Sequence, residues 1–82
     1  MEIRYSDEVL RTLRRLNKRN LIRRKIEELA EKPDSLRANV TRLQGRQEYR
    51  LRVQDWRVIF RIEDDILWID KVLPRGSAYE VT

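Results

Sequence analysis

Arginines that alternate with apolar residues mark the part of the chain where side chains capable of chemistry gather. The segments Tyr49–Val53 and Trp56–Ile62 both repeat with a period of two, which is typical of β-strands that bury one face. The short stretch between them predicts a tight turn and therefore a hairpin. Four arginines should project from the face opposite the apolar side chains: Arg50, Arg52, Arg57 and Arg61.

Guanidinium groups gathered on one exposed sheet face are suited to binding an anion. Like charges on neighbouring strands repel by a few tenths to about 1 kcal/mol per facing pair, so their clustering indicates a site for negative charge. Arginine presents a planar fork that fits phosphate oxygens, and it accounts for most of the 19 basic residues. In the alternative interpretation, Arg52 and Arg61 pair with Glu48, Glu63 or Asp70 and only cover the surface.

Arg75 and Tyr79 follow the last apolar segment and could join this group. Pro74 and Gly76 flank Arg75, which predicts a bend at this point and not a continued strand. If the bend turns back over the sheet, Tyr79 reaches the arginine face. Alternatively, Tyr79 closes the edge of the core.

A separate basic run lies in the first half of the chain. Its members are Arg11, Arg14, Arg15, Lys18, Arg19, Arg23, Arg24 and Lys25. Such a run can contact a nucleic-acid backbone without sequence selectivity. The alternative is the solvated outer face that any pair of packed helices needs.

The first half of the chain predicts a strand followed by two helices. Residues 2–5 alternate as a short strand, and Ser6 is a suitable N-cap for a helix over residues 7–18. Asn20 is a suitable cap for a second helix, which must end before Pro33. The short connection between the helices predicts an antiparallel helix hairpin.

The second half predicts an irregular segment and then a meander of strands. Residues 33–46 show no clear period, the arginine hairpin follows, and Ile66–Leu73 is a nearly continuous apolar strand that Pro74 ends. We therefore expect one α+β domain over residues 1–82, with the order β-α-α-β-β-β. The helix hairpin should pack on one face of a small, mostly antiparallel sheet, leaving the other face to the arginines.

Composition narrows the possible functions. The chain has 82 residues, a formal net charge of +5 and 40% hydrophobic residues, but no cysteine and no histidine. Disulfides, thiol chemistry, histidine-based triads and most zinc sites are therefore excluded, and we expect neither a metal nor another cofactor. With no apolar run of about 20 residues and no signal-peptide pattern at the start, we expect a small soluble cytoplasmic domain that does not act at a membrane and is stabilised by a partner.

The segment Tyr49–Val53 with Asp55–Arg61 resembles the central hairpin of the RelE/ParE toxin superfamily. The usual family pattern is Tyr-Arg-x-Arg-x-Gly-Asp-Tyr-Arg-x-x-Phe, and this chain has Gln54 for the glycine and Trp56 for the second tyrosine. The order of elements, the acidic turn at 63–65 and the closing stretch 74–79 extend the resemblance over nearly the whole chain.

The resemblance implies the toxin of a type II toxin–antitoxin system. RelE-like members enter the ribosomal A site on the 30S subunit and cut mRNA, and their catalytic positions match Arg50, Arg52, Arg57, Arg75 and Tyr79. Several of these relatives carry Lys or His where Arg50 and Arg52 stand. For contact with RNA or the ribosome we expect Arg42, Arg46, Arg61, Arg14 and Lys18.

ParE-like members suggest the alternative, a DNA gyrase inhibitor without catalytic activity. Both branches imply a cognate antitoxin, which should be acidic and partly disordered and should fold on binding. It would cover the arginine face or displace the C-terminal tail. We expect the isolated toxin to be a monomer.

Overall fold

The computed structural model describes residues 1–76 and contains five strands, two α-helices and one 3₁₀-helix. The elements follow in the order β1 (Glu2–Tyr5), α1 (Asp7–Arg14), α2 (Arg19–Glu31), η1 (Pro33–Asn39), β2 (Val40–Arg42), β3 (Tyr49–Val53), β4 (Trp56–Glu63) and β5 (Ile66–Pro74). None of the described helices is long and apolar enough to cross a membrane.

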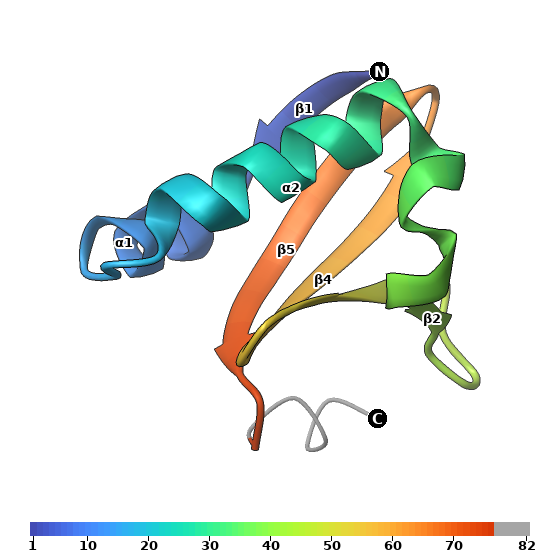
Figure 1. Cartoon of the computed structure of the whole chain (residues 1–82). Helices are drawn as coiled ribbons and strands as arrows, with labels where there is room; N and C mark the ends of the chain where they lie inside the picture. Colours follow the sequence, from blue (N-terminus) through green and yellow to red (C-terminus); the bar gives the residue numbers. More distant parts are fainter. Residues whose placement is uncertain (77–82) are drawn as a thin grey trace.

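The strands form one sheet with the order β1-β5-β4-β3-β2. β1 runs parallel to β5, and the other neighbours are antiparallel. Both α-helices cover the same face of this sheet, which we call the inner face (Figure 1). The opposite side is the outer face. The predicted α+β class and the helix hairpin on one face are confirmed, although the sequence did not reveal β2 or η1.

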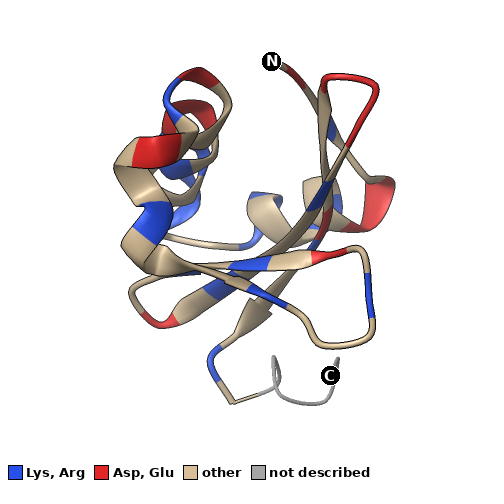
Figure 2. Cartoon of the chain, turned by 90° about the vertical axis from the view of Figure 1, so that its right-hand side faces the viewer, with Lys and Arg blue, Asp and Glu red and all other residues tan. Residues whose placement is uncertain are grey.

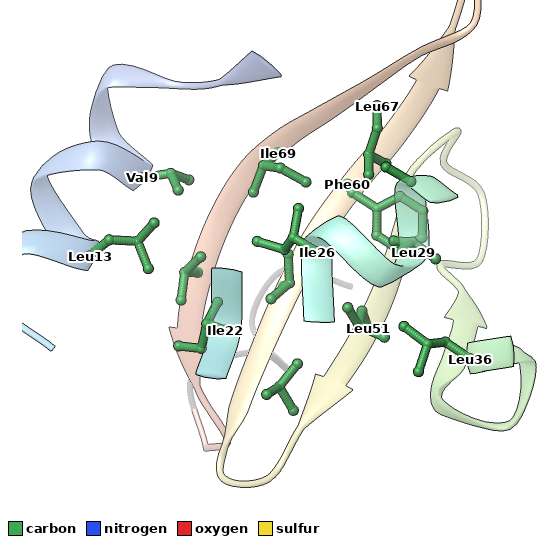
Figure 3. Packing of buried hydrophobic residues seen from close by; sticks show 14 residues of the cluster. Val9, Leu13, Ile22, Ile26, Leu29, Leu36, Leu51, Phe60, Leu67 and Ile69 are labelled. Carbon is green, nitrogen blue, oxygen red and sulfur yellow. The ribbon is translucent and has the colours of Figure 1, made fainter. Parts of the chain in front are cut away.

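The core lies between the helix pair and the inner face. Leu51, Val58 and Phe60 alternate with outward-pointing residues on β3 and β4 and are at most 2% exposed. Ile22 and Ile26 of α2 lie above them and are fully buried (Figure 3). Burial of aliphatic side chains of this size contributes roughly 1.5–3 kcal/mol each, so this layer fixes which strand residues face outward.

Ser6 caps α1 and also attaches it to β5. Its Oγ accepts a hydrogen bond from the Val9 backbone N at 3.1 Å and donates one to the Asp70 carbonyl at 3.2 Å. Its backbone N donates to the Ile69 carbonyl at 3.1 Å. The predicted N-cap is confirmed. The same residue attaches the first turn of α1 to the middle of β5.

The helix boundaries differ from the prediction. α1 ends at Arg14 and not at residue 18, because the chain tightens there into turns with Leu16 N donating to Leu13 O at 3.2 Å. That tightening lets Leu16 pack against the core. α2 begins at Arg19, so Asn20 is not its cap, and Lys18 at the N-cap position makes no side-chain cap hydrogen bond.

The segment predicted to be irregular is ordered at its start. η1 occupies Pro33–Asn39, and Ser35 Oγ donates to Glu28 Oε2 and to the Lys32 carbonyl, both at 2.8 Å. β2 then adds to the edge of the sheet beside β3. η1 therefore directs the chain from the helix layer to the sheet edge, next to the arginine hairpin.

Candidate anion-binding site

Outward-facing residues of neighbouring strands stand opposite one another and form rows across the outer face. In the first row, Arg52 of β3 lies opposite Arg57 of β4. In the second row, Arg50 of β3 lies opposite Ile59 of β4, which lies opposite Lys71 of β5. Successive rows are about 7 Å apart, because each is two residues further along the strands. Arg50, Arg52 and Arg57 are therefore brought together as predicted.

These three arginines line a cavity of about 210 Å³ at the edge of the sheet. Its walls are Ala38, Asn39, Thr41, Arg50, Arg52 and Arg57. The cavity is too small for most organic ligands but can admit a phosphate group. Its donors are guanidinium, amide and hydroxyl groups, all of which can donate hydrogen bonds to anionic oxygens.

Sequence reasoning missed Asn39 and Thr41. Thr41 lies opposite Arg50 in the β2–β3 pairing, and Asn39 ends η1. Neither had a signal in the sequence, because β2 has only three residues and gives no period to recognise.

The Arg57 side chain is held in place by the hairpin turn. Its Nη1 donates to the backbone carbonyls of Gln54 at 2.7 Å and Trp56 at 2.9 Å. Gln54 itself has a φ of 53°, in the left-handed region that tight hairpin turns use. A guanidinium fixed in this way loses less side-chain entropy when an anion binds.

Two arginines of the cavity have no acidic partner in the part of the chain that the structure describes. Within residues 1–76, Arg52 and Arg57 form no ion pair with a carboxylate. The interpretation that Arg52 only pairs with an acid on the surface therefore fails for the described part of the chain.

For Arg61 that interpretation is correct. Its Nη1 lies 2.9 Å from Glu63 Oε1 and its Nε lies 3.1 Å from Asp70 Oδ2. The pKa of Arg61 is raised above its usual value, mainly because of the hydrogen bond to Glu63. Arg61 is thus a structural partner of two carboxylates, one row removed from the cavity.

Asp70 reaches Arg61 because β5 contains a β-bulge. Ile59 pairs with Lys71 whereas Phe60 pairs with Ile69, so Asp70 is the extra residue. Burial raises the pKa of Asp70, and the neighbouring Glu48 carboxyl raises it further, whereas Arg61 lowers it. Glu48 in turn pairs with Arg46. Within residues 1–76, the outer face therefore changes from two arginines without a carboxylate partner, Arg52 and Arg57, to mixed charge at Asp70.

Figure 2 shows the same change along the sheet. Blue segments lie where β3 and β4 run side by side, with one red segment in the turn that joins them, and the longer acidic turn after Glu63 stands at the other end, near the N terminus. A polyanion on this face would be attracted to the end of the sheet that carries the cavity and repelled by the acidic end.

Arg75 lies at the cavity end of the sheet. Its backbone N donates to the Asp55 carbonyl in the β3–β4 turn at 2.8 Å. This hydrogen bond holds the backbone of Arg75 beside the hairpin that carries Arg52 and Arg57. Tyr79, the last of the predicted catalytic residues, lies outside the described residues.

The other predicted contact residues do not join the cavity. Arg42 and Arg46 line a separate hollow formed by the loop of residues 42–47. Arg14 and Lys18 lie at the end of α1 and just before α2, in the helix layer on the far side of the sheet. Any contact they make with RNA would be independent of the cavity.

Comparison with known proteins agrees with the fold. Residues 3–79 match the model of the family described as the ParE toxin of the type II toxin–antitoxin system parDE. A search of curated proteins finds no match.

Several solved structures share the architecture. Archaeal RelE in its complex with RelB from Pyrococcus horikoshii is 26% identical, with a TM-score of 0.78 over 92% of this chain and 94% of that one. YafQ from Escherichia coli is 18% identical, with a TM-score of 0.76 over 95% and 97% of the two chains. RelE of the intact E. coli RelBE complex is 20% identical, with a TM-score of 0.69 over 87% and 92%.

The family match covers nearly all of the chain, and the structural matches cover the helix hairpin together with the sheet that carries the arginine cavity. The chain therefore belongs to the ParE toxin family of type II toxin–antitoxin systems, within the RelE/ParE superfamily.

Proposed function

We propose that this toxin is an endoribonuclease that cuts mRNA in the ribosomal A site and holds the scissile phosphate in the arginine cavity. The observation that carries the proposal is the uncompensated charge of Arg52 and Arg57, which lie opposite each other at a cavity of about 210 Å³. The similarity to archaeal RelE supports the ribonuclease branch.

The chemistry requires little beyond charge and position. RNA supplies its own nucleophile, the 2′-hydroxyl, which attacks the adjacent phosphorus and releases the 5′-oxygen of the next nucleotide. Negative charge accumulates on the phosphate oxygens during this step, and arginines placed around them stabilise it, an effect worth roughly 3–4 kcal/mol for one well-placed donor. Arg50, Arg52, Arg57 and Arg75 would supply this stabilisation.

Proton transfer needs another group, because arginine is too basic to exchange protons readily at neutral pH. Tyr79 would act as the general base in this proposal. A free phenol titrates near 10, and neighbouring guanidinium groups favour the phenolate form and lower that value.

The ribosome would supply the remaining positioning. The cavity is large enough for a single phosphate, so it would fix one point of a flexible RNA, which would rarely place its 2′-oxygen in line for attack. We therefore infer slow cleavage of free RNA and fast cleavage of mRNA held in the A site, in the cytoplasm. A cognate antitoxin, like the RelB chains in complex with the archaeal and E. coli RelE proteins, would silence the toxin.

The second candidate is inhibition of DNA gyrase without catalysis. The observation in its favour is that the matching family model is that of ParE. A basic sheet face attracts DNA phosphates as readily as RNA phosphates, so charge does not separate the two candidates.

The test is a reconstituted translation reaction in which new mRNA 5′ ends are mapped by primer extension. Codon-phased cuts should appear with the wild type, fall at least 100-fold with Arg52→Ala, and persist with Lys32→Ala, an exposed lysine directly after α2. Tyr79→Phe reports separately on the general base. Intact mRNA with undiminished translation would overturn the proposal, and a supercoiling assay with gyrase would then test the second candidate.

A further inference from the structure

Trp68 lies in the third row of the outer face, between two arginines. It stands opposite Arg4 of β1 and opposite Arg61 of β4. The guanidinium carbons lie 6.0 Å and 5.0 Å from the centre of the Trp68 ring, within the range of cation–π contacts. Trp68 is only partly buried although it is the largest side chain of the face, and the side chain of Arg4 is 56% exposed.

The arginines of this row are paired with acids, whereas Arg52 and Arg57 of the cavity have no such partner within residues 1–76. Arg4 pairs with Glu2, and Arg61 pairs with Glu63 and Asp70. The row therefore offers flat, polarisable groups without excess positive charge. A nucleotide has an anionic phosphate and an uncharged flat base, and the two ends of the outer face match these two parts.

The spacing suits a strand that crosses the face. Arg61 lies four residues beyond Arg57 on β4, which corresponds to about 13 Å along the strand. This exceeds the rise of about 3.4 Å between stacked nucleotides, but an unstacked strand with splayed bases can span it. Between the two sites, Ile59 is fully buried and Lys71 is exposed, so no bulky side chain separates them.

We propose that Trp68 and the guanidinium groups of Arg4 and Arg61, which lie over its ring, together form a stacking platform for an unpaired base of the bound RNA. The base belongs to a nucleotide close to the one whose phosphate occupies the arginine cavity. This inference rests on the proposed function for its substrate class. It assigns to Trp68 a role in positioning and in base preference, because a large ring stacks better on purines than on pyrimidines.

The stacking can be measured without cleavage. A short single-stranded RNA with 2′-O-methyl groups lacks the nucleophile and remains intact. In a Trp56→Phe background Trp68 is the only remaining tryptophan of the chain, so its fluorescence reports on this ring alone. The intrinsic signal should be quenched saturably by the RNA at low salt, and replacing one base of the oligonucleotide by an abasic site should remove the quenching.

Matched variants separate stacking from folding. Trp68→Leu should weaken RNA binding roughly tenfold or more, as measured by the anisotropy of labelled RNA, whereas Trp68→Phe should retain most of the affinity. Lys32→Ala, at an exposed lysine outside the basic run of the helices, should bind like the wild type. The circular dichroism spectrum and the urea midpoint of each variant establish that the sheet is intact.

The outcomes distinguish this inference from the proposed function. RNA binding without quenching, or Trp68→Leu binding as tightly as the wild type, would overturn the platform and leave the nuclease untouched. Quenching by RNA together with intact mRNA in the translation assay would overturn the nuclease and keep the platform. Absence of RNA binding in the wild type at low salt would overturn both.

Discussion

Arg52 and Arg57 stand directly opposite each other in the β3–β4 ladder, and neither forms an ion pair with a carboxylate within residues 1–76. Cross-strand pairs of opposite charge stabilise a sheet, and like charges in the same place destabilise it. The toxin fold tolerates this repulsion beside a cavity whose other walls carry hydrogen-bond donors. The pair therefore does not serve the stability of the sheet, which agrees with the anion-binding role proposed above.

Replacing Arg52 should separate activity from stability. Arg52→Ala removes the repulsion with Arg57, so the free energy of unfolding should stay the same or rise by up to about 1 kcal/mol. Cleavage of mRNA should fall at least 100-fold. Urea unfolding and primer extension on the same preparation measure both, with Lys32→Ala as the control. Lower stability with normal cleavage would show that Arg52 has a structural role only.

Two isoleucines of β4 should respond very differently to truncation. Ile59 is fully buried although it lies on the outer face among basic residues, whereas Ile62 is 45% exposed. Ile59→Ala should lower the free energy of unfolding by about 2–5 kcal/mol, and Ile62→Ala by less than about 1 kcal/mol. Urea unfolding monitored by circular dichroism gives both values. Equal losses would mean that the outer face is not packed over Ile59.

The contrast between these isoleucines shows how far the sequence could predict the fold. The period of two correctly assigned the faces of β3 and β4, and it placed Ile59 with the arginines. It could not predict that Ile59 is buried there, because that depends on neighbouring strands and loops. Leu43, buried outside the main core cluster, belongs to a segment in which no period was visible.

The site was predictable to a similar extent. Alternation was enough to bring Arg50, Arg52 and Arg57 together, since the hairpin register is set locally by a short turn. The partners of Arg61 were not decided by the sequence, because the bulge at Asp70 follows no periodic signal. Arg14 was predicted from its charge to contact RNA as part of a separate basic run, and the structure places it in the helix layer, away from the cavity.

A glycine in the turn between β4 and β5 should make the folded protein more stable. Asp64 and Asp65 have φ values of 53° and 62°, in the left-handed region where a side chain costs energy. Asp65→Gly produces the Asp-Gly pair favoured in such hairpins and should raise the free energy of unfolding by about 0.5–1 kcal/mol. Thermal unfolding measures the change. Asp34→Gly, inside η1, is the control and should destabilise, and a loss of stability in both variants would contradict the turn geometry.

Asp70 should make the toxin less stable as the pH rises. Burial, helped by the adjacent Glu48 carboxyl and opposed by Arg61, raises the pKa of Asp70 in the folded protein. The folded state then binds the proton more tightly than the unfolded chain does, so the contribution of this group to stability is present at pH values below the ordinary aspartate pKa. It is lost as the pH rises through the folded-state pKa.

Asp70→Asn removes this titration and keeps a side chain of the same shape. As the pH rises, the free energy of unfolding of the variant should therefore increase relative to that of the wild type. Urea unfolding in steps between about pH 3 and pH 7 measures that difference directly. Asp34→Asn provides the control for the loss of one carboxylate, because the Asp34 side chain is 93% exposed. If the wild type instead becomes more stable relative to the variant as the pH rises, the ion pair with Arg61 affects the pKa of Asp70 more than burial does. Asp70 would then stabilise the row of Arg4, Trp68 and Arg61 at neutral pH.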